Sequence, residues 1–275
     1  MTNLLEINNL SVDFPSRRGQ VAAVNKVSIA VAKGEVLGLV GESGAGKSTV
    51  GNSIINLLEP PGYISGGEIN FDGNRIDQLS NEEMRKIRGA KIGTIFQDPQ
   101  TSLNPLMTIG KQLSETLIET LKISGASARE KSIELLDSVG IPNPEPRLDA
   151  YPHQFSGGMR QRVVIALALA GDPDLIIADE PTTALDVSIQ KQILDLIKSL
   201  CKQRNLGVII VTHDIGVIAE IADRVAVMYN GQLVEQGKVE QVLQKPKHDY
   251  TKSLISAVPS GDQKLHRFTV VDYID

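Results

Sequence analysis

Cysteine, tryptophan and long apolar segments are scarce in this chain of 275 residues. The single cysteine, Cys201, excludes a disulfide within the chain, and its place in a helical pattern predicts an inert, partly buried thiol. The longest uninterrupted apolar run, residues 163–170, is far too short to cross a bilayer. Residues 1–14 lack the basic start and the apolar core of a secretory signal peptide. We therefore expect a cytoplasmic chain that reaches a membrane only through a partner.

Charge of one sign is not concentrated anywhere along the sequence. The net charge is −5 at pH 7 and no run of Lys and Arg exceeds a pair, which argues against a nucleic-acid-binding surface. Charged residues of both signs make up 22% of the chain and hydrophobic residues 41%, so bulk disorder is excluded. This composition suffices for the core of one sizeable domain or of two small ones.

The sequence does contain a glycine-rich segment, GESGAGKST, at residues 41–49. It matches the pattern G-x-x-x-x-G-K-[ST] at every position and follows the apolar run 36–40, which predicts a buried strand. Glycines let successive N–H groups point at an anion, and a helix predicted from Thr49 onward turns its positive N-terminus toward it. An ordinary glycine-rich turn is the alternative, and the complete pattern disfavours it. The segment predicts a nucleoside triphosphate site.

The polar groups of this segment have expected roles at the phosphates. Lys47 supplies a positive charge for the β- and γ-phosphates, and the Ser48 hydroxyl can ligate Mg²⁺. The expected phosphate contacts are Gly41, Ser43, Gly44, Ala45, Gly46, Lys47, Ser48 and Thr49.

Hydrophobic periodicity divides the first part of the chain into strand-rich and helix-rich regions. Residues 3 to about 35 and 67–73 alternate apolar and polar side chains, which predicts strands. From about 100 to 165 the period becomes helical, with a capping box at 127–130 and a proline-rich linker at 142–152. The second region therefore predicts a helical subdomain.

The later part of the chain alternates strands and helices. Two strongly apolar strand candidates, 175–178 and 208–211, are separated by a predicted helix at 188–206 that Gly207 closes. This order is typical of a parallel sheet. Asn-Gly at 230–231 predicts a hairpin with a type I′ turn. The chain thus predicts an α/β nucleotide-binding core that the helical subdomain interrupts.

Two carboxylates, Asp179 and Glu180, follow the first of these apolar strands. Ligands bind at the C-terminal ends of strands in a parallel sheet, so we expect both residues beside the glycine-rich segment. Asp179 is predicted to hold Mg²⁺ through water, and Glu180 to orient the attacking water. An acidic loop after a core strand is the alternative, which the complete glycine-rich segment disfavours.

A second glycine-rich segment, FSGGMRQR, occupies residues 155–162. Ser156 is predicted to cap a helix, while Gly157 and Gly158 leave the helix N-terminus bare, which suits the close approach of an anion. The alternative is an ordinary capped helix with a glycine-rich start. The position of this segment just before the strand that ends in Asp-Glu disfavours that alternative.

With these three segments the chain resembles the ATP-binding subunit of an ABC transporter, and the resemblance covers residues 3 to about 260. Gln97 in IFQDP matches the Q-loop of that family, Asp186 in ALD its D-loop, and His213 in VTHD its switch histidine. Phe14 matches the position of the aromatic that stacks on adenine, although a lone Phe after a strand fits a core equally well.

The resemblance implies the P-loop NTPase fold of an ABC ATPase cassette. In it a mostly parallel core sheet is joined by an N-terminal antiparallel β subdomain and by a helical subdomain, here at about 100–165. The cassette would span residues 1–260, with 261–275 as a tail of the family's C-terminal extension. Many members carry cysteines there for an iron–sulfur cluster, and this tail has none, so no cluster is expected.

Narrower strings are similar to the dipeptide, oligopeptide and nickel importer ATPases. They lie at residues 96–105, 151–162 and 178–187. Residues 247–259 are similar to the tail of the same subgroup, with Asp249 where proline is usual. Peptide, nickel complex, glutathione and other small solutes stay open as cargo, and the resemblance favours peptide.

The resemblance implies that ATP, with Mg²⁺ as its cofactor, is sandwiched between residues 41–49 of one subunit and 156–158 of another. The implied roles are charge neutralisation by Lys47, direct Mg²⁺ ligation by Ser48 and Gln97, water-mediated Mg²⁺ binding by Asp179, water positioning by Glu180, a γ-phosphate contact by His213, and further ATP contacts by Phe14, Ser156, Gly157, Gly158 and Asp186.

The implied partners are a second ATPase subunit, usually a different chain in this subgroup, two membrane-spanning permease subunits and, indirectly, an external solute-binding protein. The chain would lie peripherally on the cytoplasmic face of the cell (inner) membrane. One rival is an ABC ATPase acting on ribosomes or DNA, but the interval from Gly46 to Ser156 leaves no room for the coiled coil of such proteins. Another is a regulatory subunit with a dead site, against which intact Glu180 and His213 argue.

Overall fold

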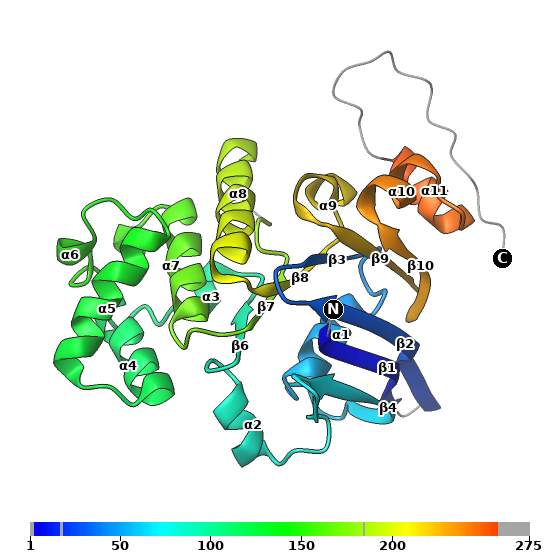
Figure 1. The fold of residues 1–275 in the computed structure, drawn as a ribbon, viewed down its shortest axis with the longest axis horizontal. Coiled ribbons are helices and arrows are strands. Elements are labelled where there is room, and N and C mark those ends of the chain that lie inside the picture. Colours follow the sequence, from blue (N-terminus) through cyan, green and yellow to red (C-terminus); the bar gives the residue numbers. More distant parts are fainter. Residues whose placement is uncertain (1–2, 17–18, 184, 258–275) are drawn as a thin grey trace.

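The computed structural model describes residues 3–16, 19–183 and 185–257, and Figure 1 shows how its elements are arranged. The strands are β1 (Asn3–Ser16), β2 (Gly19–Ala32), β3 (Val36–Val40), β4 (Tyr63–Phe71), β5 (Asn74–Arg75), β6 (Ile92–Ile95), β7 (Leu175–Asp179), β8 (Gly207–Thr212), β9 (Arg224–Tyr229) and β10 (Gln232–Lys238). The helices are α1 (Lys47–Ile54), α2 (Asn81–Ile87), α3 (Pro99–Ser102), α4 (Ile109–Leu121), α5 (Gly125–Ser138), α6 (Pro144–Arg147), the 3₁₀ helix η1 (Pro152–Gln154), α7 (Gly157–Leu169), α8 (Val187–Arg204), α9 (Ile215–Ile221), α10 (Val239–Gln244) and α11 (Asp249–Ser256).

Within the residues described, a sheet of order β10-β9-β3-β8-β7-β6 forms the centre of the fold. Its neighbouring strands pair in parallel, except for β10 and β9. β3 and β8 are buried along their whole length, because both faces of the sheet are covered, as is typical of parallel sheets. The predicted mostly parallel core sheet is confirmed.

The side chains of β3 alternate between two hydrophobic cores, one on each face of the central sheet. Leu37 and Leu39 pack with α1 and with the antiparallel sheet of order β2-β1-β4-β5. Val36 and Val40 belong to the other core, which the central sheet forms with α7 to α10 and which continues into α4 and α5 (Figure 1). The predicted N-terminal antiparallel subdomain is therefore present, and its long β1–β2 hairpin covers one face of the nucleotide-binding core.

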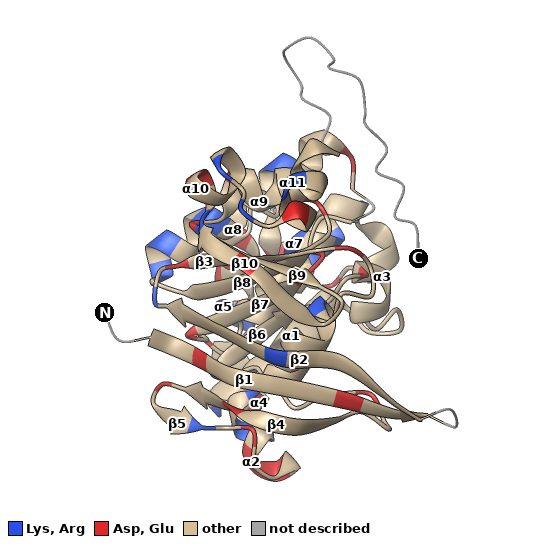
Figure 2. Cartoon of the chain, turned by 90° about the vertical axis from the view of Figure 1, so that its right-hand side faces the viewer, with Lys and Arg blue, Asp and Glu red and all other residues tan. Residues whose placement is uncertain are grey.

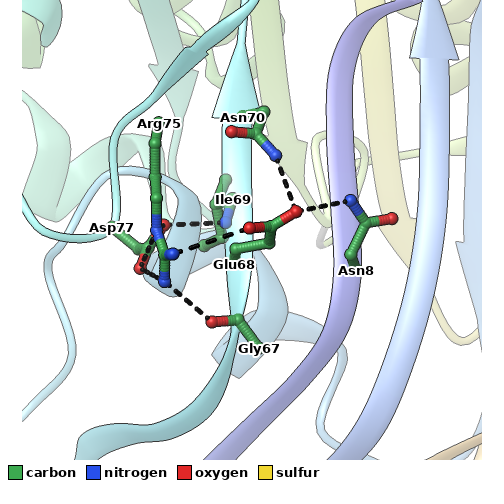
Figure 3. Close-up of polar contacts among 7 residues, drawn as sticks. All are labelled: Asn8, Gly67, Glu68, Ile69, Asn70, Arg75 and Asp77. Carbon is green, nitrogen blue, oxygen red and sulfur yellow. Dashed lines mark hydrogen bonds and ion pairs between the residues drawn. The ribbon is translucent and has the colours of Figure 1, made fainter.

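A polar network fixes the β4–β5 end of the antiparallel sheet (Figure 3). The Asp77 carboxyl accepts hydrogen bonds from the Ile69 N–H at 2.8 Å and from the Arg75 guanidinium at 3.0 Å. Arg75 also donates to the Gly67 carbonyl at 3.1 Å and lies 3.5 Å from Glu68. Burial would raise the pKa of Asp77, but the hydrogen bonds from Arg75 and Ile69 outweigh it and lower the pKa.

The predicted helical subdomain is formed by α3 to α7 and lies at the β6 end of the central sheet (Figure 1). α7 packs on β6 and on α3, α4 and α5, so it joins the subdomain to the core. The predicted linker at 142–152 is not fully extended. It contains the short helix α6. Proline is tolerated at its first residue, Pro144, because the first residue of a helix needs no backbone N–H donor.

Local hydrogen bonding moves some predicted helix boundaries. Helix α5 begins before the predicted capping box, because the Ser124 hydroxyl accepts from the backbone N–H of Ser127 at 3.3 Å and caps the helix. Helix α8 ends at Arg204, before the predicted end at 206, because its C-cap residue Asn205 has a φ of +53°, and Gly207 starts β8. The turn at 230–231 has φ values of +46° and +74°, as the predicted type I′ turn requires.

Cys201 lies on α8 and is more buried than predicted. Its Sγ donates a hydrogen bond to the Leu206 carbonyl at 3.0 Å, and burial raises the pKa of the thiol to about 11. The thiolate is therefore strongly disfavoured at neutral pH, which agrees with an inert structural cysteine. Over the three described ranges, the helices are too short or too polar to cross a bilayer.

Candidate active site

The C-terminal ends of the parallel strands bring the predicted site residues to one edge of the central sheet. The glycine-rich loop 41–46 follows β3, Asp179 ends β7 and Glu180 follows it, His213 follows β8, and Gln97 lies in the segment after β6. The structure therefore gathers residues that lie far apart in the sequence, as the parallel topology predicts.

The loop 41–46 has a shape that depends on glycine. Gly46 has a φ of +93°, and a Cβ at this position would collide with the carbonyl oxygen of Ala23. Helix α1 then begins at Lys47, before the predicted start at Thr49, with Gly46 as its N-cap. The N–H groups of its first turn, which have no acceptor within the helix, thus adjoin the loop, and this arrangement suits the predicted binding of phosphates.

Lys47 folds back over the loop that precedes it. Its Nζ donates to the carbonyl oxygens of Gly41 and Glu42, each at 2.8 Å, and the residue is 6% exposed. Burial lowers the pKa of the ammonium group, while the carboxylates of Glu180 and Asp179 oppose this shift. The Lys47 ammonium group is therefore hydrogen-bonded to loop carbonyls, next to the N–H groups that are predicted to bind phosphates.

Asp179 is suited to hold a cation. Its Oδ1 is buried and has no hydrogen-bond partner within the described part of the chain. Burial raises the pKa of Asp179, the Ser48 hydroxyl opposes this by hydrogen bonding, and the charge of Glu180 adds to it. A divalent cation would satisfy the free oxygen and offset the repulsion between the carboxylates. Because Mg²⁺ prefers oxygen ligands, Asp179 and Ser48 fit the predicted metal site.

Glu180 accepts hydrogen bonds on both of its carboxylate oxygens. Gln97 Nε2 and Thr183 Oγ1 donate to Oε2 at 2.8 and 2.9 Å, and His213 Nδ1 lies 2.7 Å from Oε1. Burial would raise the pKa of Glu180, but the hydrogen bonds from His213 and Thr183 outweigh it and lower the pKa. The carboxylate is therefore ionised at neutral pH, as a group that orients or deprotonates water must be.

The sequence motifs did not single out Thr183. Its N–H donates to the Glu180 carbonyl at 3.2 Å, so the two residues close a turn that brings the Thr183 hydroxyl to the carboxylate. Glu180 itself has a φ of +46°, which is rare outside glycine, and its N–H donates to the Val211 carbonyl at 2.8 Å. The sequence signal for Thr183 was its hydroxyl three positions after Glu180, because a turn of this length can bring the two side chains together.

The N-terminus of α7 is exposed and is not part of this cluster. Ser156 caps the helix, as predicted, by accepting from the Met159 N–H at 3.3 Å. Gly158 is required for packing, since a Cβ there would lie 2.7 Å from the Ile189 side chain on α8. Because α7 packs on β6, while β8 and β7 separate β6 from β3, Ser156 and Gly157 lie away from the chain's own glycine-rich loop.

Phe14 and Asp186 also lie outside the cluster around Glu180. Phe14 borders the antiparallel core, and Gly62 leaves room for its ring, so the core role is observed and the adenine contact stays a prediction. Asp186 caps α8 by accepting from the Ile189 N–H at 3.0 Å. Ala184, two positions earlier in the same predicted loop, lies outside the described residues.

Comparisons with known proteins decide the family. The family model described as "ABC transporter" matches residues 24–183, which is more than half of the chain. The chain belongs to the ABC transporter family. This ABC ATPase therefore hydrolyses ATP, and the expected family and fold class are confirmed. A second family model, "Oligopeptide/dipeptide transporter, C-terminal region", matches residues 234–272.

Relatives and solved structures agree with this assignment. The oligopeptide transport ATP-binding protein OppD of Bacillus subtilis is 52% identical over 96% of this ABC ATPase and 75% of its own length. The dipeptide transport ATP-binding protein DppD of the same species is 50% identical over 99% and 82%. The ATP-binding cassette MJ0796, solved as a dimer with ADP and Pi, has a TM-score of 0.75 and 32% identity, covering 86% of this chain and 98% of its own.

We expect Glu180→Gln to bind ATP but to hydrolyse it at least about a hundredfold more slowly, because general-base catalysis contributes on that scale. Binding is measured with a fluorescent ATP analogue and turnover by phosphate release. Glu119→Gln is the matched control, since that carboxylate is exposed in an ion pair with Arg85, outside the site. Near-normal turnover in Glu180→Gln would remove Glu180 from this role.

We expect the pKa of Glu180 to lie below its usual value. In His213→Ala it should rise, because the variant loses a hydrogen bond that offsets the effect of burial on this pKa. A carboxyl-detected NMR titration measures both values. A lowered pKa means that Glu180 stabilises the fold above its unfolded-state pKa and loses this effect as the pH falls through its folded-state pKa. His153→Ala, whose ring stacks on Tyr151, is the control. An unchanged Glu180 titration in His213→Ala would contradict the observed contact.

Proposed function

We propose that this chain is the ATP-hydrolysing motor subunit of an importer that takes up peptides, or a related small solute, through a membrane permease. The observation that carries the proposal is the match of residues 234–272 to the C-terminal region of oligopeptide and dipeptide transporters. The high identity to OppD and DppD, whose names assign them to peptide transport, supports it. In this proposal the cassette spans residues 1–260, with 261–275 as a tail.

The proposed division of labour follows the geometry of the sheet edge. The N–H groups of the loop 41–46 and the Lys47 ammonium hold the phosphates, and Ser48, Asp179 and Gln97 hold Mg²⁺. When bound, Mg²⁺ neutralises charge on the phosphates. Of the remaining groups, Glu180 orients the attacking water and accepts its proton, and His213 contacts the γ-phosphate.

Three side chains orient the Glu180 carboxylate. Gln97 and Thr183 donate to Oε2, whereas His213 lies on Oε1, so these three contacts do not fill the roughly four acceptor sites of a carboxylate. We propose that nucleotide binding exchanges one of these contacts for a contact to the nucleotide. Gln97 and His213 are the candidates, because both are also proposed to contact the nucleotide site.

We propose that the N-terminus of α7 completes the ATP site of a second ATPase subunit. Ser156 and Gly157 are exposed, and a helix N-terminus attracts phosphate. The similar cassette MJ0796 was solved as a dimer, which supports such a sandwich. ATP would then supply the attraction between the subunits, and its hydrolysis would open the pair. In the importer subgroup the second subunit is usually a different chain.

Exposed apolar side chains support a permease contact near Gln97. Phe96 is 47% exposed and Leu106 is 85% exposed, and they flank α3 where the core meets the helical subdomain. Such side chains mark interaction sites in soluble domains. We place the two permease subunits against this region and the chain on the cytoplasmic face of the cell (inner) membrane, bound peripherally. A solute-binding protein would act from the outside.

Co-purification from detergent-solubilised membranes tests the proposed function. We expect two multispanning proteins and a second ATPase subunit, identified by mass spectrometry. Ribosomes or DNA in their place would favour an ABC ATPase of nucleic acid, which the net charge of −5 and the intermixed charges in Figure 2 disfavour. ATP binding without turnover in the complete complex would favour a regulatory subunit.

We expect Ser156→Arg to leave ATP binding by the single subunit unchanged but to prevent ATP-induced association with the second ATPase. The arginine side chain would occupy the space in which Ser156 is proposed to meet the phosphates bound to the second subunit. Light scattering with the hydrolysis-deficient Glu180→Gln variants measures the association. Ser199→Arg is the control, since Ser199 is exposed near the far end of α8. Association that survives Ser156→Arg would exclude the cross-subunit site.

A further inference from the structure

The C-terminal helix α11 contacts the glycine-rich loop directly. The Tyr250 hydroxyl oxygen accepts a hydrogen bond from the backbone N–H of Glu42 at 2.9 Å, across 208 positions of sequence. Glu42 lies in the part of the chain that matches the ABC transporter family, and Tyr250 in the part that matches the C-terminal region of peptide transporters. The hydrogen bond therefore joins the two family-specific parts of the chain at the phosphate site.

The peptide group between Gly41 and Glu42 is held at both of its polar ends. Its carbonyl oxygen, which belongs to Gly41, accepts from Lys47 Nζ at 2.8 Å, and its N–H donates to Tyr250. Because a peptide group is planar, these two contacts fix its orientation where the loop leaves β3. The contact to Tyr250 does not involve Lys47, so it holds this peptide group independently of the Lys47 side chain.

Tyr250 is held in place by contacts of its own. The residue is 6% exposed, and its ring packs on Tyr229 with centroids 4.3 Å apart. The segment before α11 is tied to β10, because Glu235 accepts from the N–H groups of Lys247 and His248 at 2.9 and 3.0 Å. His248 Nδ1 accepts the Tyr250 N–H at 3.2 Å and caps α11. The hydroxyl is therefore presented to the loop by a well-packed support.

The hairpin turn between β9 and β10 adds a second contact to the same loop. The Gly231 N–H donates to the Ala45 carbonyl at 3.2 Å. The part of the chain that follows β9 thus touches the loop at its start, through Tyr250, and again just before α1. Both contacts use backbone groups of the loop, so they act on its conformation rather than on a particular side chain.

We propose that Tyr250 is a positioning residue of the nucleotide site, and that α11 thereby raises the affinity of the loop 41–46 for ATP and ADP. The inference rests on the proposed role of this loop in binding phosphates. The hydrogen bond of Tyr250 goes to the loop, whereas the groups proposed for hydrolysis surround Glu180. The effect should therefore fall on nucleotide binding and not on the hydrolytic step.

Tyr250→Phe tests this, because it removes the hydroxyl and keeps the ring on Tyr229. In the full chain we expect the dissociation constants of ATP and ADP, and the KM for ATP, to rise about threefold to tenfold, the effect of one ordinary hydrogen bond. The kcat at saturating ATP should not change. Exchange of the Glu42 amide hydrogen should become faster in the nucleotide-free chain. Tyr63→Phe, whose hydroxyl contacts Gln20, is the control.

The outcomes separate this inference from the proposed function. Unchanged nucleotide affinity and unchanged amide exchange in Tyr250→Phe would overturn the inference, while ATP hydrolysis by the wild-type chain would still support the motor function. A lower unfolding temperature and a lower kcat with an unchanged KM would assign Tyr250 a structural role and would also overturn it. A wild-type chain that binds no nucleotide would refute the proposed function and the inference together.

Discussion

The site depends on the parallel pairing of β3, β8, β7 and β6. Parallel strands point the same way, so their C-terminal ends share one edge and the loops that follow them meet there. Such a sheet needs cover on both faces, which the antiparallel sheet with α1 and the helices α8 to α10 provide. The same pairing places Asp179 and Glu180 near Lys47, whose charge moderates the repulsion between the two carboxylates.

Features that a few neighbouring residues determine could be predicted from the sequence. The apolar runs predicted buried strands, the complete glycine pattern predicted a loop with positive φ values, and Asn-Gly predicted a tight turn, and the structure shows all three. Helix starts were harder: the capping box at 127–130 predicted the start of α5, but the hydroxyl of Ser124 caps the helix instead. The contacts of Gln97 and Thr183 with Glu180 could not be predicted, because they depend on side-chain conformations in the assembled fold.

Lys47 and Glu180 at the sheet edge are hydrogen-bonded within the chain, whereas Asp179 Oδ1 has no hydrogen-bond partner among the described residues. Lys47 rests on two loop carbonyls, and Glu180 accepts hydrogen bonds from three side chains. In the proposed function a bound nucleotide replaces some of these contacts, so its binding free energy would reflect exchanged hydrogen bonds and not only new ones. Gln97 also lies in the loop that leads to α3. In the proposed function, an exchange at Glu180 would be passed through this loop to the helical subdomain, where the exposed Leu106 lies.

The bond between α11 and the loop places unequal demands on its two partners. Glu42 contributes only a main-chain N–H, which every amino acid except proline possesses, whereas Tyr250 contributes a hydroxyl at the end of a long, rigid side chain. Any residue other than proline at position 42 therefore keeps the donor. At position 250 a substitution that removes the hydroxyl removes the acceptor, so the two partners of this bond tolerate replacement unequally.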